Sequence, residues 1–179
     1  MMMHLMSLRG VLTLVSVCIA TGPMFAQISP VSVGESQQEI LDQLSGESGG
    51  IPYELYASTS ESLKAGYSNE IGYEVAVTCD FENGRCTKTF VEWKASDLDT
   101  RVILRKWFEE VVSMNKESVA YARDPLMEKQ LLGSYENGRS RVAVFVSEDV
   151  SERIILVFHA EDRYSYLSQM HQVYFWAEE

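Results

Sequence analysis

The sequence predicts an α+β fold in which helices pack on a single antiparallel sheet, in the arrangement of type III secretion chaperones, with one hairpin disulfide. Two patterns predict helices and strands in one chain: apolar and polar residues alternate over residues 70–79, and apolar residues recur at helical spacing after Ser96. The length of 179 residues, 46% of them hydrophobic, suits a single domain with its own core.

Residues 1–26 have the three-part layout of a secretory signal peptide. A segment with Arg9 and no acid precedes an apolar run over 11–20, and Ala26 offers a cleavage point. The alternative is a membrane anchor, but the run is about half of the roughly 20 residues that a spanning helix needs. We therefore expect a periplasmic or secreted bacterial protein that has no transmembrane span after signal removal. We also expect a flexible lead-in at residues 27–36, followed by one domain at residues 37–179.

The chain is acidic, with 15 lysines and arginines against 26 aspartates and glutamates and a net charge of −11. Removal of the signal takes away Arg9 and no acid, so the mature chain is more acidic still. Nucleic-acid binders need clustered cations that displace counterions from phosphate. The charge therefore disfavours a nucleic-acid partner and electrostatic docking on an anionic membrane.

The first elements can be placed by their end signals. Ser36 is a helix N-cap, and the apolar stripe that follows it predicts a helix that extends to residue 45. Residues 51–57 favour a strand, whereas 58–69 fit either a short strand or an irregular connection. The alternating residues 70–79 and a return strand over 86–93 predict a hairpin.

Cys79 and Cys86 flank the hairpin turn. A two-residue turn at 83–84 would leave the cysteines diagonal to each other, whereas a four-residue loop over 81–84 sets them directly opposite and pairs an aspartate with an arginine. We expect the second register and a structural disulfide, worth about 2–3 kcal/mol in an exported chain. The alternative is a redox centre, although six residues separate the sulfurs and a Cys-x-x-Cys site has two.

A long helix is predicted to begin at Ser96 or Asp97, followed by a further helical segment over 117–122. Asp124 and Pro125 interrupt this region, and residues 126–132 resume as a helix before Gly133. Residues 141–146 alternate as a strand. Residues 154–176 remain ambiguous, because their apolar residues fit one helical face while the run over 154–158 and the aromatic C-terminus favour strands.

The sequence contains no phosphate-binding glycine loop and no hydrolase or calcium-binding motif, so we expect no catalytic residue, no metal and no cofactor. The best catalytic candidate is His159 with Glu161 and Asp162 behind it, because a strand places His159 and Glu161 on one face. No nucleophile is apparent beside them. The simpler interpretation is a solvated histidine at the end of an element.

Aromatic residues crowd the C-terminus, and they are either core residues or a protein interface. They are Tyr164, Tyr166, Tyr174, Phe175 and Trp176.

Several motifs together resemble a known family. They are the short helix at 37–45, the hairpin from Tyr73 to Trp93 with its two cysteines, the helix motif Lys106-Trp107-Phe108, the segment 133–138, and Val150-Ser151-Glu152. In these motifs the chain resembles the YbjN family of bacterial sensory transduction regulators. The resemblance implies the chaperone-like fold, a helix over the C-terminal segment and a binding role, and it supplies no catalytic residue.

We therefore expect an exported, non-enzymatic module that binds a protein partner, in a chaperone-like or regulatory role. One alternative is a periplasmic inhibitor or immunity protein whose acidic surface meets a basic enzyme. A second alternative is a small hydrolase centred on His159.

Overall fold

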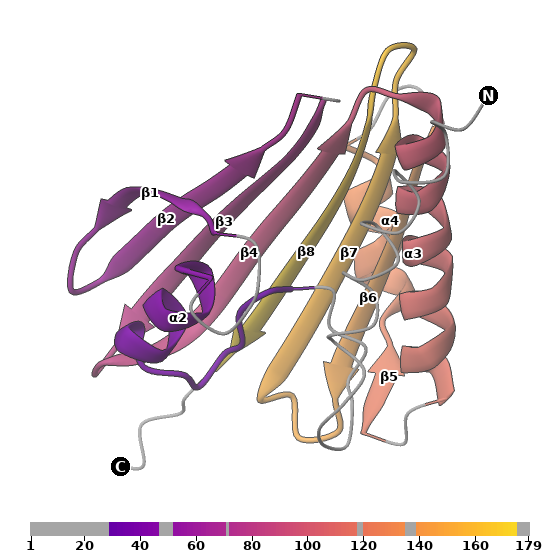
Figure 1. Cartoon of the computed structure of the whole chain (residues 1–179). Helices are drawn as coiled ribbons and strands as arrows, with labels where there is room; N and C mark the ends of the chain where they lie inside the picture. The colour runs from indigo at the N-terminus through magenta and orange to yellow at the C-terminus, as the bar shows by residue number, and fades with distance from the viewer. Residues whose placement is uncertain (1–28, 47–51, 71, 118–119, 135–138, 175–179) are drawn as a thin grey trace.

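The computed structural model describes residues 29–46, 52–70, 72–117, 120–134 and 139–174. Its strands are β1 (Glu54–Ser58), β2 (Ser62–Ser68), β3 (Tyr73–Glu82), β4 (Arg85–Ala95), β5 (Tyr121–Arg123), β6 (Ser140–Ser147), β7 (Glu152–Ala160) and β8 (Ser165–Val173), and its helices are α2 (Gln37–Leu44), α3 (Leu98–Glu117) and α4 (Pro125–Leu132). The strands form one antiparallel sheet in the order β1-β2-β3-β4-β8-β7-β6-β5 (Figure 1). The predicted α+β class with a single antiparallel sheet is confirmed.

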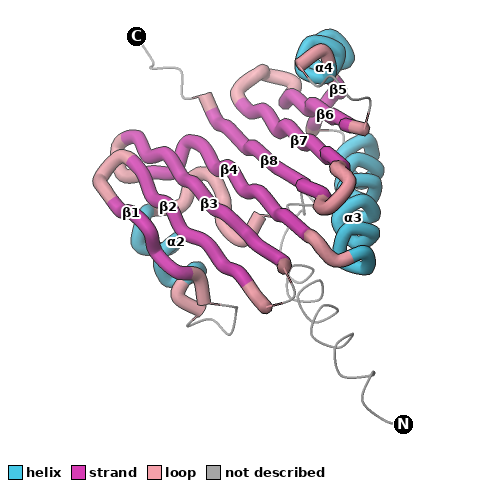
Figure 2. The backbone as a smooth tube through the Cα atoms, turned by 90° about the horizontal axis from the view of Figure 1, so that it is seen from above, coloured by secondary structure: helices cyan, strands magenta, loops and turns pink. Residues whose placement is uncertain are grey.

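The sheet consists of two meanders that meet at its centre. The first runs from β1 to β4 and the second from β6 to β8, and β4 pairs with β8 from Lys88↔Gln172 to Ala95↔Ser165. Helices α2 and α3 lie on one face of this sheet, and α4 lies on the other face over β6 (Figure 2).

The main core lies between the sheet and the α2/α3 layer. Every second residue of the central strands points into it, and Val77, Val91, Leu156 and Leu167 are almost fully buried. The helices contribute their buried stripes, from Ile40 in α2 and from Leu104, Phe108 and Val111 in α3. The alternate residues of the same strands therefore face away from this core.

The helices begin at the residues that the sequence indicates. Ser36 and Glu39 form a capping box, in which the Ser36 hydroxyl accepts from the Glu39 amide at 3.3 Å and the Glu39 carboxylate accepts from the Ser36 amide at 2.7 Å. The Asp97 carboxylate accepts from the Thr100 amide, and Asp124 caps α4. Of the helix expected over 117–122, Glu117 is the last residue of α3, but the expectation is wrong at Tyr121 and Ala122, because Tyr121–Arg123 pairs with β6 as β5.

The hairpin between β3 and β4 has a different register from the expected one. Asn83 and Gly84 have φ values of 51° and 74°, so they form a two-residue turn that matches the twist of the strands. A bulge follows between Asp80 and Phe81, so that Cys79 pairs with Thr89 and Phe81 pairs with Cys86. The expected four-residue loop is therefore wrong, because Asn-Gly adopts the left-handed conformation at little cost.

The bulge still places both cysteine side chains in the core. Cys79 and Cys86 are fully buried, and they are free thiols 4.4 Å apart, well beyond the S–S bond length of about 2.05 Å. The predicted disulfide is therefore not formed in this structure.

The C-terminal segment forms strands. β7 and β8 pair along their whole length, from Glu152↔Val173 to Ala160↔Ser165, so the helix that the family resemblance implied is wrong. The apolar run over 154–158 arises because β7 is covered on both faces: Ile154 and Leu156 belong to the main core, while Ile155 packs with Met127 of α4. A strand covered twice loses the alternation that would have identified it.

The predicted signal peptide lies outside the described residues. Of the predicted lead-in, residues 29–35 are irregular, Val31 is buried, and the Gly34 amide donates to the Cys86 carbonyl at 2.7 Å. Within the described ranges no helix has the length and apolar character needed to cross a membrane.

Candidate functional site

On one face of the sheet, no helix of the described ranges lies over the central strands. The side chains of β3, β4 and β8 that point away from the main core lie on this face, and α4 covers only its β6 end (Figure 2). We call it the open face. Strand register arranges its residues in rows that run across the strands.

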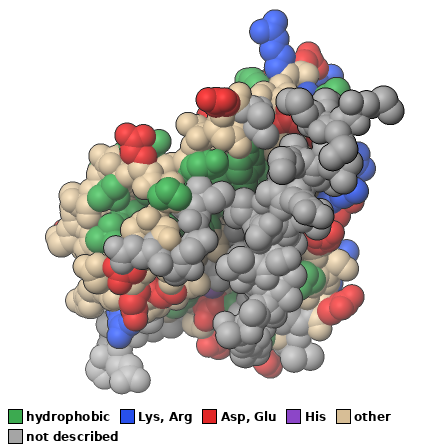
Figure 3. Space-filling model, viewed as in Figure 1, with side chains coloured by type: hydrophobic (Ala, Val, Ile, Leu, Met, Phe, Trp, Pro, Cys, Tyr) green, Lys and Arg blue, Asp and Glu red, His purple; other side chains and the backbone are tan. Residues whose placement is uncertain are grey.

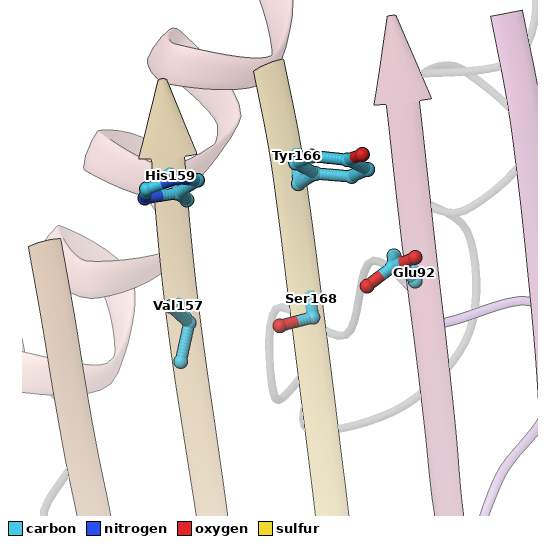
Figure 4. A pocket seen from close by; sticks show the side chains of 5 residues that line it. All are labelled: Glu92, Val157, His159, Tyr166 and Ser168. Carbon is cyan, nitrogen blue, oxygen red and sulfur yellow. The ribbon is translucent and has the colours of Figure 1, made fainter. Parts of the chain in front are cut away.

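A hollow of about 260 Å³ lies in the centre of the open face, lined by Glu92, Val157, His159, Tyr166 and Ser168 (Figure 4). These side chains come from β4, β7 and β8. Glu92, Ser168 and Val157 form one row, and Tyr166 and His159 belong to the next.

Small residues leave room in the Glu92 row. Ala76 and Gly66 continue it across β3 and β2, and the Tyr56 ring of β1 lies over Gly66. A Cβ atom at Gly66 would come within 2.7 Å of that ring. The absence of a side chain at this position therefore allows Tyr56 to lie flat at the end of the row.

Glu92 is half-buried on the floor of the hollow, and no hydrogen bond or ion pair joins its carboxylate to another described residue. Burial raises its pKa, and the charge of nearby Lys94 opposes this shift. Lys94 itself contacts both oxygens of Glu74, at 3.0 and 3.1 Å. Glu92 is thus a carboxylate without a counter-ion of its own.

His159 lies between a serine and a carboxylate. Its Nδ1 is 2.6 Å from the Ser140 hydroxyl, and its Nε2 is 3.3 Å from Glu161 Oε1. The expectation that His159 and Glu161 share a face is confirmed by this contact. Strand pairing also places Ser140 of β6 against His159, a neighbour that the sequence did not reveal.

Asp162, the third predicted catalytic candidate, lies outside this group. Its carboxylate forms an ion pair with Arg139, and its carbonyl accepts from Arg101. Ser140 could have been found from the sequence only by aligning β6 with β7, because it is 19 residues from His159.

One of the predicted interface tyrosines, Tyr166, lines the hollow, and a second, Tyr164, packs against it. The Tyr164 and Tyr166 rings meet edge to face at 5.0 Å, and Lys94 Nζ lies 5.8 Å from the centre of the Tyr164 ring. Hydrogen bonds to Glu161 and Tyr166 raise the pKa of Tyr164 to about 12. These residues form a polar, aromatic border at one end of the open face.

Tyr174 lies at the far end of β8, where its hydroxyl accepts from Arg153 and donates to Gln172, both at 3.1 Å. Phe175 and Trp176 lie outside the described residues. The structure therefore groups Tyr164 with Tyr166 and separates Tyr174 from them.

The other histidine in the described part of the chain belongs to the core. His171 is 95% buried with its Nε2 3.2 Å from Glu152 Oε2, and burial lowers its pKa. The Tyr121 hydroxyl donates to the same carboxylate. Across the described ranges, no three histidines, cysteines, aspartates or glutamates gather as a metal site.

No protein family, curated protein or solved structure matches this chain. The resemblance to the YbjN family therefore stays a prediction.

The raised pKa of Glu92 predicts a pH dependence of stability. The folded chain holds this proton more tightly than the unfolded chain, whose pKa is near the ordinary 4.5. The contribution of Glu92 to the stability of the folded chain is therefore fully present below about pH 4.5. It is lost as the pH rises through the pKa that Glu92 has in the folded chain. Glu92→Gln keeps the neutral form, so it should unfold at higher urea than wild type at pH 7 and lose this advantage near pH 4.

Urea unfolding between pH 4 and 8, with an NMR titration of the Glu92 carboxyl carbon, measures this effect. Lys94, Glu74, His159 and Tyr166 face the same region, so their titrations are followed together. Asp80→Asn is the matched control, because it removes a carboxylate whose partner is Lys88. Equal stability of wild type and Glu92→Gln at every pH would contradict the prediction.

Proposed function

We propose that this protein is an exported, non-enzymatic module that binds a basic segment of a partner protein across its open face, in a chaperone-like or regulatory role. The observation that carries the proposal is the hollow on this face, where a half-buried carboxylate without a partner lies beside aromatic side chains. Interfaces favour such aromatic anchors around a desolvated polar group.

Apolar groups on the open face support a protein partner. Phe90 is 37% exposed and pairs with Met170, and Tyr56 is 62% exposed at the β1 end. Phe90 lies in the row next to Glu92 and Tyr56 at the end of the Glu92 row, so a partner could bury apolar area near the carboxylate in two directions.

Charge supports a basic partner. The chain has a net charge of −11, and acidic side chains are spread over the helix-bearing face in Figure 3 rather than gathered in one patch. A charge of this size speeds association with cationic proteins and disfavours acidic ones. An inhibitor or immunity protein directed at a basic enzyme is one form of this function.

Site-specific photocrosslinking in the native envelope tests the proposal. A photoreactive phenylalanine analogue at Phe90 should give a covalent adduct with a basic protein, and 0.5 M salt should reduce the yield because it screens the long-range attraction. The control is the same probe at Leu98, which is 74% exposed on α3. Equal adducts from both positions, or an acidic partner, would contradict the proposal.

The contacts of His159 favour a small hydrolase as a second candidate. With Nε2–H directed at Glu161, Nδ1 can accept the Ser140 proton as the hydroxyl oxygen attacks an ester carbonyl. The bond from the serine oxygen to the carbonyl carbon forms as the carbonyl electron pair moves to its oxygen. That pair then re-forms the carbonyl while the ester C–O bond breaks, and the imidazolium gives its proton to the leaving alcohol. Water then hydrolyses the acyl-serine by the same steps and restores the hydroxyl. General-base assistance of this kind contributes roughly 10²–10⁴-fold.

A fluorophosphonate probe separates this candidate from the binding module. For a hydrolase, we expect the probe to label wild type and the Ser168→Ala control, and Ser140→Ala to lose both labelling and roughly 10²-fold or more of the hydrolysis of short p-nitrophenyl esters. Ser168 lines the hollow without contacting His159 in any described bond. An unlabelled wild type excludes the serine hydrolase and leaves the non-enzymatic function.

We further propose that the cysteine pair closes after export. The Cys79 thiol donates toward Cys86, which lowers the pKa of Cys86 and favours its thiolate as the attacking group. With an external disulfide as oxidant, the two thiols release two protons and two electrons, and the oxidant is reduced to two thiols.

Peptide mapping of the exported protein without reductant should show Cys79 and Cys86 linked. Cys79→Ser should leave the remaining thiol free to react with maleimide after unfolding. Two free thiols in the wild-type exported protein would reject both the disulfide and its predicted stabilisation.

A further inference from the structure

We propose that the hollow of the open face receives a lysine or arginine side chain of the partner, with Glu92 as its counter-ion and the Tyr166 ring as its aromatic contact. This inference rests on the proposed function and names the group that the hollow recognises. Figure 4 shows Glu92 of β4 beside the small side chain of Ser168 on β8, with the Tyr166 ring in the next row along β8.

The electrostatic pairing on β3 and β4 leaves Glu92 available. Lys94 is held by Glu74, and Lys88 contacts Asp80 at 3.4 Å, so the lysines of β4 are each paired with an acid of β3. A carboxylate that is half removed from water binds a cation more strongly than an exposed one, because water competes less. An incoming ammonium or guanidinium group would therefore supply the missing charge.

The aromatic side chains fit the same ligand. The Tyr166 ring is nearly parallel to His159, at 6.5 Å between centres and an angle of 21°, and Tyr164 packs against its edge. A cation over such a ring gains roughly 0.5–1 kcal/mol at an exposed site. Both nitrogens of His159 already contact Ser140 and Glu161. The His159 ring therefore lines the hollow without offering a nitrogen to the incoming cation.

The volume of the hollow fits a long side chain. About 260 Å³ leaves room for an aliphatic stem, and Val157 is an apolar residue in its lining. Phe90 and Met170 form the adjacent row, where the stem or its backbone can pack. An acidic side chain would face Glu92 and be repelled.

Titration of the ¹⁵N-labelled mature chain at pH 7 tests this inference. The probes are acetyl-lysine-N-methylamide, acetyl-arginine-N-methylamide and the uncharged acetyl-norleucine-N-methylamide. We expect saturable shifts at the amides of Glu92, Tyr166 and Ser168 with the two cationic probes and none with norleucine. Glu92→Gln should weaken binding at least tenfold, and Tyr166→Leu roughly two- to fivefold.

Asp80→Asn is the matched control, because it removes one carboxylate from the same face outside the hollow, and its affinity should equal that of wild type. Equal binding of norleucine, equal affinity of Glu92→Gln, or no shift with any probe would overturn the inference. Methylammonium binding as tightly as the lysine probe would also overturn it, in favour of a site for free amines.

The two proposals fail separately. If the Phe90 crosslink to a basic protein persists unchanged in Glu92→Gln, the open face binds its partner without a basic side chain in the hollow. If the cationic probes bind but no crosslink forms at Phe90, the hollow recognises cations while the proposed function is wrong.

Discussion

The pairing of β4 with β8 is the contact on which the rest of the structure depends. It joins two meanders that are separated in the chain by α3, β5 and α4, and it makes one sheet from them. The hollow exists only because this pairing sets Glu92 beside Ser168 and brings Tyr166 next to it. Folding and the candidate site therefore depend on the same long-range strand register. Closing the long loop between β4 and β8 costs conformational entropy, which burial of the core residues must offset.

The two faces of the central strands have different roles. On the face toward α2 and α3, alternate residues such as Val91 and Leu167 are almost fully buried and supply hydrophobic stability. On the open face, the intervening residues leave a carboxylate half-buried without a counter-ion, at a cost in stability. A carboxyl group whose burial raises its pKa and opposes its ionisation is the kind of feature that marks a functional site.

The sequence predicted those elements whose signals are local. The N-cap at Ser36, the strand expected over 70–79 and the helix expected over 126–132 depend on neighbouring residues. All three elements are present, although the strand spans Tyr73–Glu82 and the helix begins at Pro125. The hairpin register was missed, since it depends on a bulge that a turn motif alone does not reveal. The C-terminal strands were ambiguous because α4 covers the outer face of β7 and so removes the alternation.

By itself the sequence determined the α+β class and the acidic charge, and it offered His159 with Glu161 as neighbours, because composition and short spacing require no knowledge of distant segments. Only the tertiary structure decided that Ser140 lies against His159 and that Glu92, Ser168 and Tyr166 share one hollow. These residues are far apart in the chain, and strand order and register alone bring them together. The sites are long-range, so no local pattern could encode them.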